Sequence, residues 1–329
     1  MTGSRLRAIG AVAVAMFLAG AAFAEEADNE AIVNALFAAG GNQQKVRASG
    51  AKGVCVSGSF SPSPNATALS KAPHFAKTLP VTGRFSMGGS NLKVSDKAKP
   101  ITRGLAMRIG DEASGELVFV FISAPFFSTR TPQQLLEFAR VRAPGSDGKP
   151  DVEKIKAFTA ANPETGKQAA WLNARPVPAS FAGVDFWGAH AFTLTDAQGK
   201  STVARLKFVA QAGQLGLSDD ELKAKPDSFY ADELKERLAK GPAAFDLVAI
   251  LAEPGDPTGD PTATWPEESR KSVKLGTLSI AGIAPSETCD SGTFDPVVAL
   301  PDGLAGPADD PMFAIRSPTY AISLSRRSQ

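Results

Sequence analysis

The sequence predicts an antiparallel β-barrel with peripheral helices and an N-terminal arm, in the α+β class. Two observations lead to this expectation. Four strand-like stretches follow one another between residues 54 and 123, joined by turns without long helices, as in an antiparallel meander. Four further strand patterns come later in the chain, and the first two of these flank a glycine turn, as in a β-hairpin.

Residues 1–24 have the pattern of a secretory signal peptide. Two arginines precede an apolar run from Ala8 to Phe23, and the segment ends in Ala22-Phe23-Ala24. The run is shorter than the roughly 20 residues that a membrane-spanning helix needs, and its small-x-small ending suits a signal peptidase. We therefore expect cleavage after Ala24, export to the periplasm, and a single domain over residues 25–329.

Charge and cysteine content narrow the range of partners. Removing residues 1–24 takes the formal net charge from +1 to −1, so no basic surface points to nucleic acid or to a membrane, and small molecules are the expected partners. Cys55 and Cys289 are too few for a disulfide scaffold. An oxidising compartment permits one bridge between them, and the sequence leaves open whether it forms. The oligomeric state is also left open, a homo-oligomer included.

The first part of the mature chain predicts the arm and then the meander. A helical pattern covers the region from Glu25 to about Gln44 and stops at Gly40-Gly41. Alternating apolar residues then predict four strands. These strands are Val54–Phe60, Pro80–Ser86, Arg103–Ile109 and Glu116–Ser123.

The second part of the chain mixes helices and strands. Helical patterns cover 132–140, 151–161 and 232–240, and a further helix is expected at the C-terminus. Strand patterns cover 187–195, 202–210, 243–252 and 273–280. The polar stretch from Glu253 to Pro261 is predicted as a loop and not a domain linker, because patterned sequence resumes directly after it.

Arg316 and Tyr320 are four residues apart near the C-terminus, so on a helix they would share one face. A guanidinium favours the phenolate form of a neighbouring phenol, and a phenolate can bind haem iron. The spacing alone is a weak indication, because most such pairs are surface neighbours. Pro318 lies between the two residues, and we expect it to kink the helix, the alternative being a new helix that begins at Ser317-Pro318.

Together with other segments, this pair resembles the haem catalases, in particular the short, exported catalase-related peroxidases. The resemblance extends over nearly all of residues 40–327. The matching segments, in order, are Arg-x-x-x-Ala-Lys-Gly at 47–53, Arg-Phe-Ser at 84–86, Pro-x-Phe at 125–127, the strand around His190 with its hairpin, Thr-x-x-Trp-Pro with Leu-Gly-x-Leu from 262 to 278, and Arg-x-x-x-Tyr at 316–320. It implies a catalase-like barrel, haem b as the cofactor and peroxidase-type chemistry.

The resemblance implies a role for each matching residue. Tyr320 would be the axial ligand of the haem iron, Arg47 and Arg84 would hold the haem propionates, and Arg316 would lie beneath the porphyrin. His190 and Asp310 would support Arg316 from behind. Phe127, together with Phe85, would line the distal pocket. Without the resemblance, the arginines read equally well as surface ion pairs, His190 as a satisfied strand residue and the phenylalanines as core.

The distal side departs from the family pattern. Gly50 stands where the family has the histidine that acts as acid and base towards peroxide, and Ile122 stands where it has an asparagine. His74 and His190 are the only histidines in the chain and match other family positions. Ser86 remains as a hydroxyl that can relay a proton. A positioned acid-base is worth roughly a hundred- to ten-thousand-fold in rate, so its loss predicts weakened catalysis.

We therefore expect a haem peroxidase that reduces hydrogen peroxide or organic peroxides with an external electron donor, weakened by Gly50. One alternative is a non-enzymatic exported protein that binds haem or senses peroxide through the same Tyr320. The other is an exported barrel that binds an apolar ligand and no haem.

Overall fold

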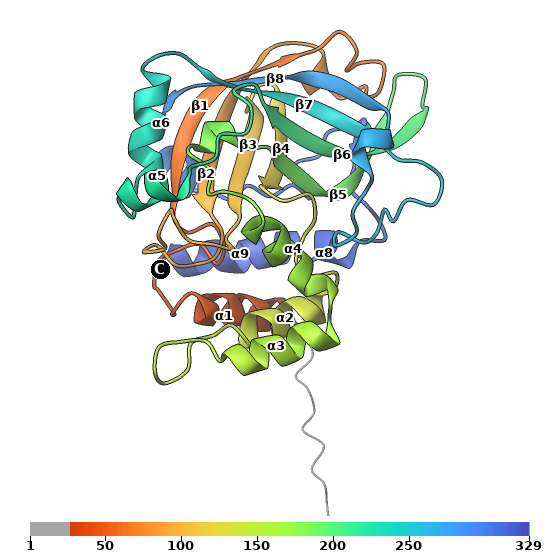
Figure 1. Ribbon diagram of the computed structural model, residues 1–329. Helices are drawn as coiled ribbons and strands as arrows, with labels where there is room; N and C mark the ends of the chain where they lie inside the picture. The colour runs from red at the N-terminus through yellow and green to blue at the C-terminus, as the bar shows by residue number, and fades with distance from the viewer. Residues whose placement is uncertain (1–26, 329) are drawn as a thin grey trace, which may run out of the picture.

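The computed structural model describes residues 27–328, and the expected signal peptide lies outside them (Figure 1). Within that range, eight strands form an antiparallel barrel in the order β4-β3-β2-β1-β8-β7-β6-β5. Ile122 in β4 pairs with Trp187 in β5 and closes it. The strands are β1 (Gly53–Pro62), β2 (Leu79–Met87), β3 (Arg103–Asp111), β4 (Gly115–Ile122), β5 (Phe186–Thr195), β6 (Ser201–Ala210), β7 (Ala243–Leu251) and β8 (Ser272–Ile283). The predicted fold class is confirmed.

Several barrel strands alternate between buried and partly exposed residues, while β5 is buried along most of its length. In β3, every second residue from Arg103 to Ile109 is buried, and β7 follows the same rule from Ala243 to Ala249. Many of the inward side chains are aromatic, and neighbouring rings pack with centroids 5.1–6.1 Å apart around Phe85. Phenylalanines that fill the barrel are Phe85, Phe119, Phe121, Phe186, Phe208 and Phe245.

Helices cover one end and one side of the barrel (Figure 1). The C-terminal helix α9 (Arg316–Arg327) lies between the barrel and a layer formed by α1 (Asn29–Ala39), α2 (Pro132–Arg140) and α3 (Val152–Ala161). Asp28, Thr131 and Asp151 cap the first turns of that layer, each accepting a hydrogen bond from a backbone amide. Helix α6 (Tyr230–Leu238) packs beside β8.

Several short elements were not predicted from the sequence. These are α4 (Glu164–Asn173), α5 (Asp219–Ala224), α7 (Glu287–Asp290), α8 (Pro311–Ala314) and the two-residue strand β9 (Leu304–Ala305), which pairs with β5. Between residues 27 and 328, no helix combines the length and apolar character needed to cross a lipid bilayer.

The expected kink at Pro318 is wrong. Helix α8 ends at Ala314, Ile315 joins the two helices, and α9 begins at Arg316. Pro318 is therefore the third residue of a new helix, in the first turn, where a missing backbone N–H removes no intrahelical hydrogen bond. The break leaves Arg316 and Tyr320 on one continuous helical turn, which is what their pairing requires.

Candidate functional site

A pocket lies between the barrel and the helices α1 and α9. It leaves about 930 Å³ of space between its walls, its open mouth included. Much of the wall is apolar. The apolar side chains are Val33, Leu36, Leu105, Val120, Phe121, Ile122 and Phe294.

Tyr320 lines this pocket from α9 and is the end of a chain of hydrogen bonds that runs from the buried Asp310 to the partly buried phenol. Arg316 donates from Nη2 to the phenolic oxygen of Tyr320 over 2.5 Å and from Nη1 to Nε2 of His190 over 2.9 Å. His190 contacts Asp310 through its other nitrogen, with 2.6 Å between Nδ1 and Oδ2. Tyr320 and the three residues expected to support it, Arg316, His190 and Asp310, are thus brought together in the fold.

The donor pattern fixes the protonation of His190. A guanidinium can only donate, so Nε2 of His190 must be the bare nitrogen and Nδ1 must hold the proton that it donates to Asp310. Burial lowers the pKa of His190, with a smaller opposing effect from the hydrogen bond to Asp310, so the imidazole is neutral in this arrangement. The negative charge of Asp310 and the positive charge of Arg316 are then balanced through a neutral ring.

Local backbone features place these side chains. In β5 the register shifts between Trp187 and Ala191, so the strand is irregular over residues 188–190, which include His190. The ring packs edge-on against Phe313, with centroids 5.1 Å apart. Asp310 is 1% exposed and caps α8, since its second oxygen accepts the amides of Met312 and Phe313.

The pocket also has a cationic part. The described residues bring three arginines to it, Arg47, Arg84 and Arg327. Arg84 is 6% exposed and donates to the carbonyls of Gly50 and Ala51 over 2.5 and 2.8 Å. Arg327 donates over 2.7 Å to a backbone carbonyl, while its Nε and Nη1 atoms are buried without a hydrogen-bond partner among residues 27–328.

Burial lowers the pKa of Arg84 and of Arg327 to about 10, and the charge of Arg47 adds to both shifts. Arg84 and Arg327 therefore remain charged at neutral pH. Asp290 opposes these shifts: its Oδ1 lies 3.0 Å from Nη2 of Arg47 and 3.4 Å from Nε of Arg84. Three positive charges and one negative charge leave a net charge of +2, which suits a ligand with two carboxylates.

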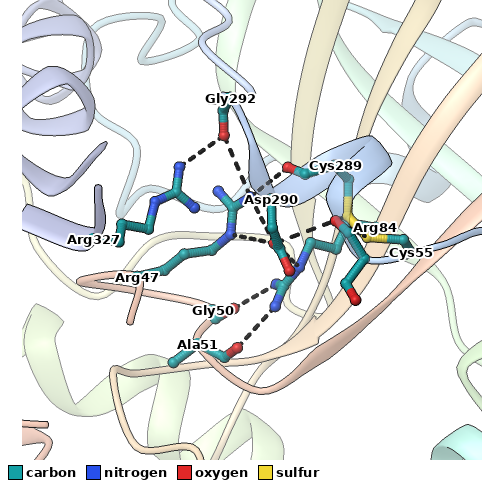
Figure 2. The surroundings of a disulfide bond; sticks show 10 residues. Arg47, Gly50, Ala51, Cys55, Arg84, Cys289, Asp290, Gly292 and Arg327 are labelled. Carbon is teal, nitrogen blue, oxygen red and sulfur yellow. Dashed lines mark hydrogen bonds and ion pairs between the residues drawn. A yellow bond between two sulfur atoms is a disulfide. The ribbon is translucent and has the colours of Figure 1, made fainter. Parts of the chain in front are cut away.

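A disulfide lies directly behind Asp290. Figure 2 shows Cys55 of β1 joined to Cys289, with Asp290 turned towards Arg47 and Arg84. The sequence left open whether Cys55 and Cys289 are bridged, and in the structure they are. The two sulfurs and the Asp290 carboxylate lie within 4.8 Å of one another, as in a metal site, but cysteines joined in a disulfide provide no thiolate ligands.

Gly50 and Ser86 both line the pocket, as does Ile122 at the end of β4. Gly50 has a φ of +68°, in the left-handed region that glycine adopts without a steric cost. A Cβ atom at this position would lie 3.1 Å from Oγ of Ser86 and 3.8 Å from Nη1 of Arg84. A side chain at position 50 would therefore enter the pocket beside Ser86.

The two phenylalanines expected in the distal pocket lie elsewhere. Among the described residues that line the pocket, neither Phe85 nor Phe127 is present. Phe85 points into the barrel and stacks on Phe181 at 5.1 Å, because the alternation of β2 turns it inward. Phe127 packs against the apolar cluster between α1 and α2. His74 is 1% exposed and contacts the carbonyl oxygen of Gly115, away from the pocket.

Sequence reasoning missed Arg327, Asp290 and the backbone carbonyl of Gly292. Arg327 lies seven residues after Tyr320, so two helical turns bring both to one face of α9, and this spacing could have been noticed. No sequence pattern would have indicated Asp290 or Gly292, because a disulfide and tertiary packing place them.

Comparisons with known proteins agree with this picture. A family model described as Catalase matches residues 42–327. The chain is 36% identical over 282 residues to a catalase-related peroxidase of Synechococcus elongatus, covering 84% of this chain and 82% of the relative. It is 31% identical over 302 residues to a catalase-related peroxidase of Mycolicibacterium paratuberculosis, covering 90% and 93%.

Two solved catalase structures share the fold. A fungal catalase superposes with a TM-score of 0.77 at 19% identity, and catalase A of Saccharomyces cerevisiae with 0.76 at 18%. Each match covers 87% of this chain, which spans 60% and 62% of the two catalase chains. At these identities the likeness bears on the fold alone.

Proposed function

The chain belongs to the catalase family and is a peroxidase-type oxidoreductase, and we propose that it uses haem b, held by Tyr320, to reduce hydrogen peroxide or organic peroxides with an external electron donor. Both relatives named above are catalase-related peroxidases, which favours this function over a non-enzymatic haem-binding or peroxide-sensing protein.

The single observation that supports haem most strongly is the environment of the Tyr320 oxygen. Tyr320 lines a largely apolar pocket, and its oxygen receives a hydrogen bond from Arg316. Three arginines line the same pocket, and together with the negative charge of Asp290 they leave a net charge of +2. A haem has an apolar ring, an iron that accepts a phenolate oxygen and two propionates. The buried, unpartnered nitrogens of Arg327, considered among the described residues, fit a carboxylate ligand in particular.

The described residues suggest a division of work. Tyr320 would bind the iron, and Arg316 would donate to the tyrosine oxygen and stabilise its negative charge. His190, oriented by Asp310, would hold Arg316 in position, because the hydrogen bonds of Arg316 to His190 and Tyr320 fix the plane of its guanidinium. Arg47, Arg84 and Arg327 would bind the propionates. When bound, haem supplies a redox-active iron at which peroxide is reduced.

Proton transfer is the weak step in this arrangement. A base beside the peroxide would take its proton and return it to the departing oxygen, and Gly50 and Ile122 can do neither. The Ser86 hydroxyl can relay a proton between water and peroxide but is a poor base at neutral pH. We therefore propose slow peroxidase turnover, with water in the space beside Gly50 taking part in proton transfer.

We also propose that residues 1–24 are a signal peptide, that residues 25–329 form one domain, and that the protein is periplasmic. The Cys55–Cys289 disulfide supports an oxidising compartment. Determination of the N-terminal sequence of the exported protein tests the proposal, and a first residue other than Glu25 would contradict cleavage after Ala24.

The proposed activity is tested with protein reconstituted with haemin. We expect peroxide-dependent oxidation of a dye donor, at a rate that exceeds that of free haemin at equal concentration. Tyr320→Phe should lose most of this rate, while Tyr230→Phe, a change inside the barrel core, should keep it. A haem-loaded protein that oxidises the dye no faster than free haemin would contradict the proposed enzyme.

A further inference from the structure

The segment 289–294 forms one wall of the pocket and holds its arginines. Thr293 and Phe294 line the pocket directly. The carbonyl oxygens of Cys289 and Gly292 accept hydrogen bonds from Nη2 of Arg47 over 2.6 and 3.4 Å, and Gly292 also accepts one from Arg327 over 2.7 Å. These contacts order two of the three guanidinium groups that would bind carboxylates (Figure 2).

This wall belongs to a long connection with little regular structure. Between β8, which ends at Ile283, and β9, which begins at Leu304, the chain contains only the four-residue helix α7. Three backbone hydrogen bonds join the connection to the barrel, from Ala284 to Cys55, from Val118 to Ala299 and from Thr195 to Gly303. All three lie outside 289–294. The disulfide between Cys55 and Cys289 therefore provides the covalent attachment at the start of the wall.

The environment of the bridge couples it to the pocket. Cys55 and Cys289 are 4% and 1% exposed and share a buried cluster with Val118 and Phe294. The guanidinium of Arg47 lies 6.0 Å from the centre of the Phe294 ring. Displacement of Cys289 would thus move a pocket-lining ring and the acceptors of Arg47 at the same time.

We propose that Cys55 and Cys289 are positioning residues, whose disulfide holds the wall 289–294 so that the pocket retains its dicarboxylate ligand. The proposal rests on haem as that ligand. A pocket whose wall and arginines are ordered beforehand loses less conformational entropy on binding and releases its ligand more slowly. Retention of the ligand should therefore depend on the thiol–disulfide state of the protein.

The redox step is an ordinary exchange with an external dithiol or disulfide. When a dithiol reduces the bridge, the S–S bond breaks, two electrons and two protons pass to Cys55 and Cys289, and the dithiol becomes a disulfide. In an oxidising compartment the reverse reaction closes the bridge. The chain would therefore acquire its tight hold on the ligand where the bridge can form.

The test measures the release of haemin from the mature chain, residues 25–329, to an excess of a haem-free globin. The variant is Cys55→Ala with Cys289→Ala, compared with the wild-type protein in its oxidised form. Leu247→Ala is the matched control, because Leu247 is fully buried in the barrel core and does not line the pocket. All three are measured at a temperature where each is folded, as judged by its thermal unfolding curve.

We expect release at least about tenfold faster from the double variant than from the wild type, and a change below about twofold for Leu247→Ala. A second readout needs no ligand: amide hydrogen exchange within 287–294 should rise in the double variant and not in the control. Equal release rates, or unchanged exchange, would overturn the positioning role while leaving haem binding intact. A wild-type protein that takes up no haemin would instead refute the proposed function on which this inference rests.

Discussion

Replacing Arg316 tests the hydrogen-bonded chain behind Tyr320 without touching the proposed ligand itself. Arg316→Met removes two charge-assisted hydrogen bonds, to the Tyr320 oxygen and to Nε2 of His190. Each such bond is worth about 1.5–3 kcal/mol, and the change also removes the positive charge that the neutral His190 ring links to the buried Asp310 carboxylate. Because these contributions overlap, we expect the free energy of unfolding to fall by about 3–5 kcal/mol.

The assay is urea unfolding of the ligand-free protein at pH 7.5, followed by tryptophan fluorescence. Arg316→Lys should lose about half as much, since one ammonium group cannot reach both partners in the geometry of a guanidinium. Arg326→Met on the same helix is the control; its ion pair with Glu30 is exposed, and its loss should be about 1 kcal/mol or less. If Arg316→Met is no more destabilising than Arg326→Met, the chain from Asp310 to Tyr320 does not stabilise the fold as we argue.

Three further predictions concern the pocket and its surroundings. Gly50→His should raise peroxidase activity roughly a hundredfold, because it restores an acid-base group beside the peroxide, but it should cost about 1–2 kcal/mol of stability because the backbone at position 50 is left-handed. Gly50→Ala should have a similar cost in stability and no gain in activity. An increase in activity below about tenfold for Gly50→His would show that the missing base is not what limits the rate. Haemin should raise the melting temperature of Asp290→Asn by more than it raises that of the wild type. The substitution removes a negative charge beside Arg47 and Arg84 and so destabilises the ligand-free state more than the loaded one. A smaller increase for Asp290→Asn than for the wild type would contradict the charge argument. Burial lowers the pKa of both His190 and His74 below 6.5, so the unfolded chain binds protons before the folded protein does on acidification. The free energy of unfolding should therefore decrease as the pH falls below about 6.5, by up to about 1.4 kcal/mol per pH unit for each histidine. His190→Gln should reduce this slope in urea titrations between pH 5.5 and 7.5, and an unchanged slope would exclude a neutral buried His190.

The sequence predicted the barrel well because several of its strands are clearly patterned, although β5 is buried almost throughout and does not alternate. Alternation alone located β3 and β7, and the arrangement Arg-x-x-x-Tyr located the helical face that holds Arg316 and Tyr320. The kink expected at Pro318 was wrong, because the helix breaks earlier, at Ile315. Local rules recognise a proline as a helix breaker but do not fix on which side of it the new helix begins.

Other parts of the site depend on contacts between distant residues. Phe127 was expected in the distal pocket, whereas its ring packs against the apolar cluster between α1 and α2. Asp290 and Gly292 follow Cys289, which is joined by a disulfide to Cys55, 234 residues away in the chain. Composition and periodicity describe neighbours in sequence, so they contain no information about such long-range placement.

The central claim, that Tyr320 binds haem iron, has one direct test. The chain contains only two tyrosines, and Tyr230 lies in the barrel core with its hydroxyl donating to the carbonyl of Pro178. Haemin titration should give one Soret-absorbing complex per chain, with the resonance Raman bands of an iron-bound tyrosinate. We predict that Tyr230→Phe keeps these bands and that Tyr320→Phe, still folded, loses them. Tyrosinate bands that persist in Tyr320→Phe, or no haemin uptake by the wild-type protein, would contradict the account.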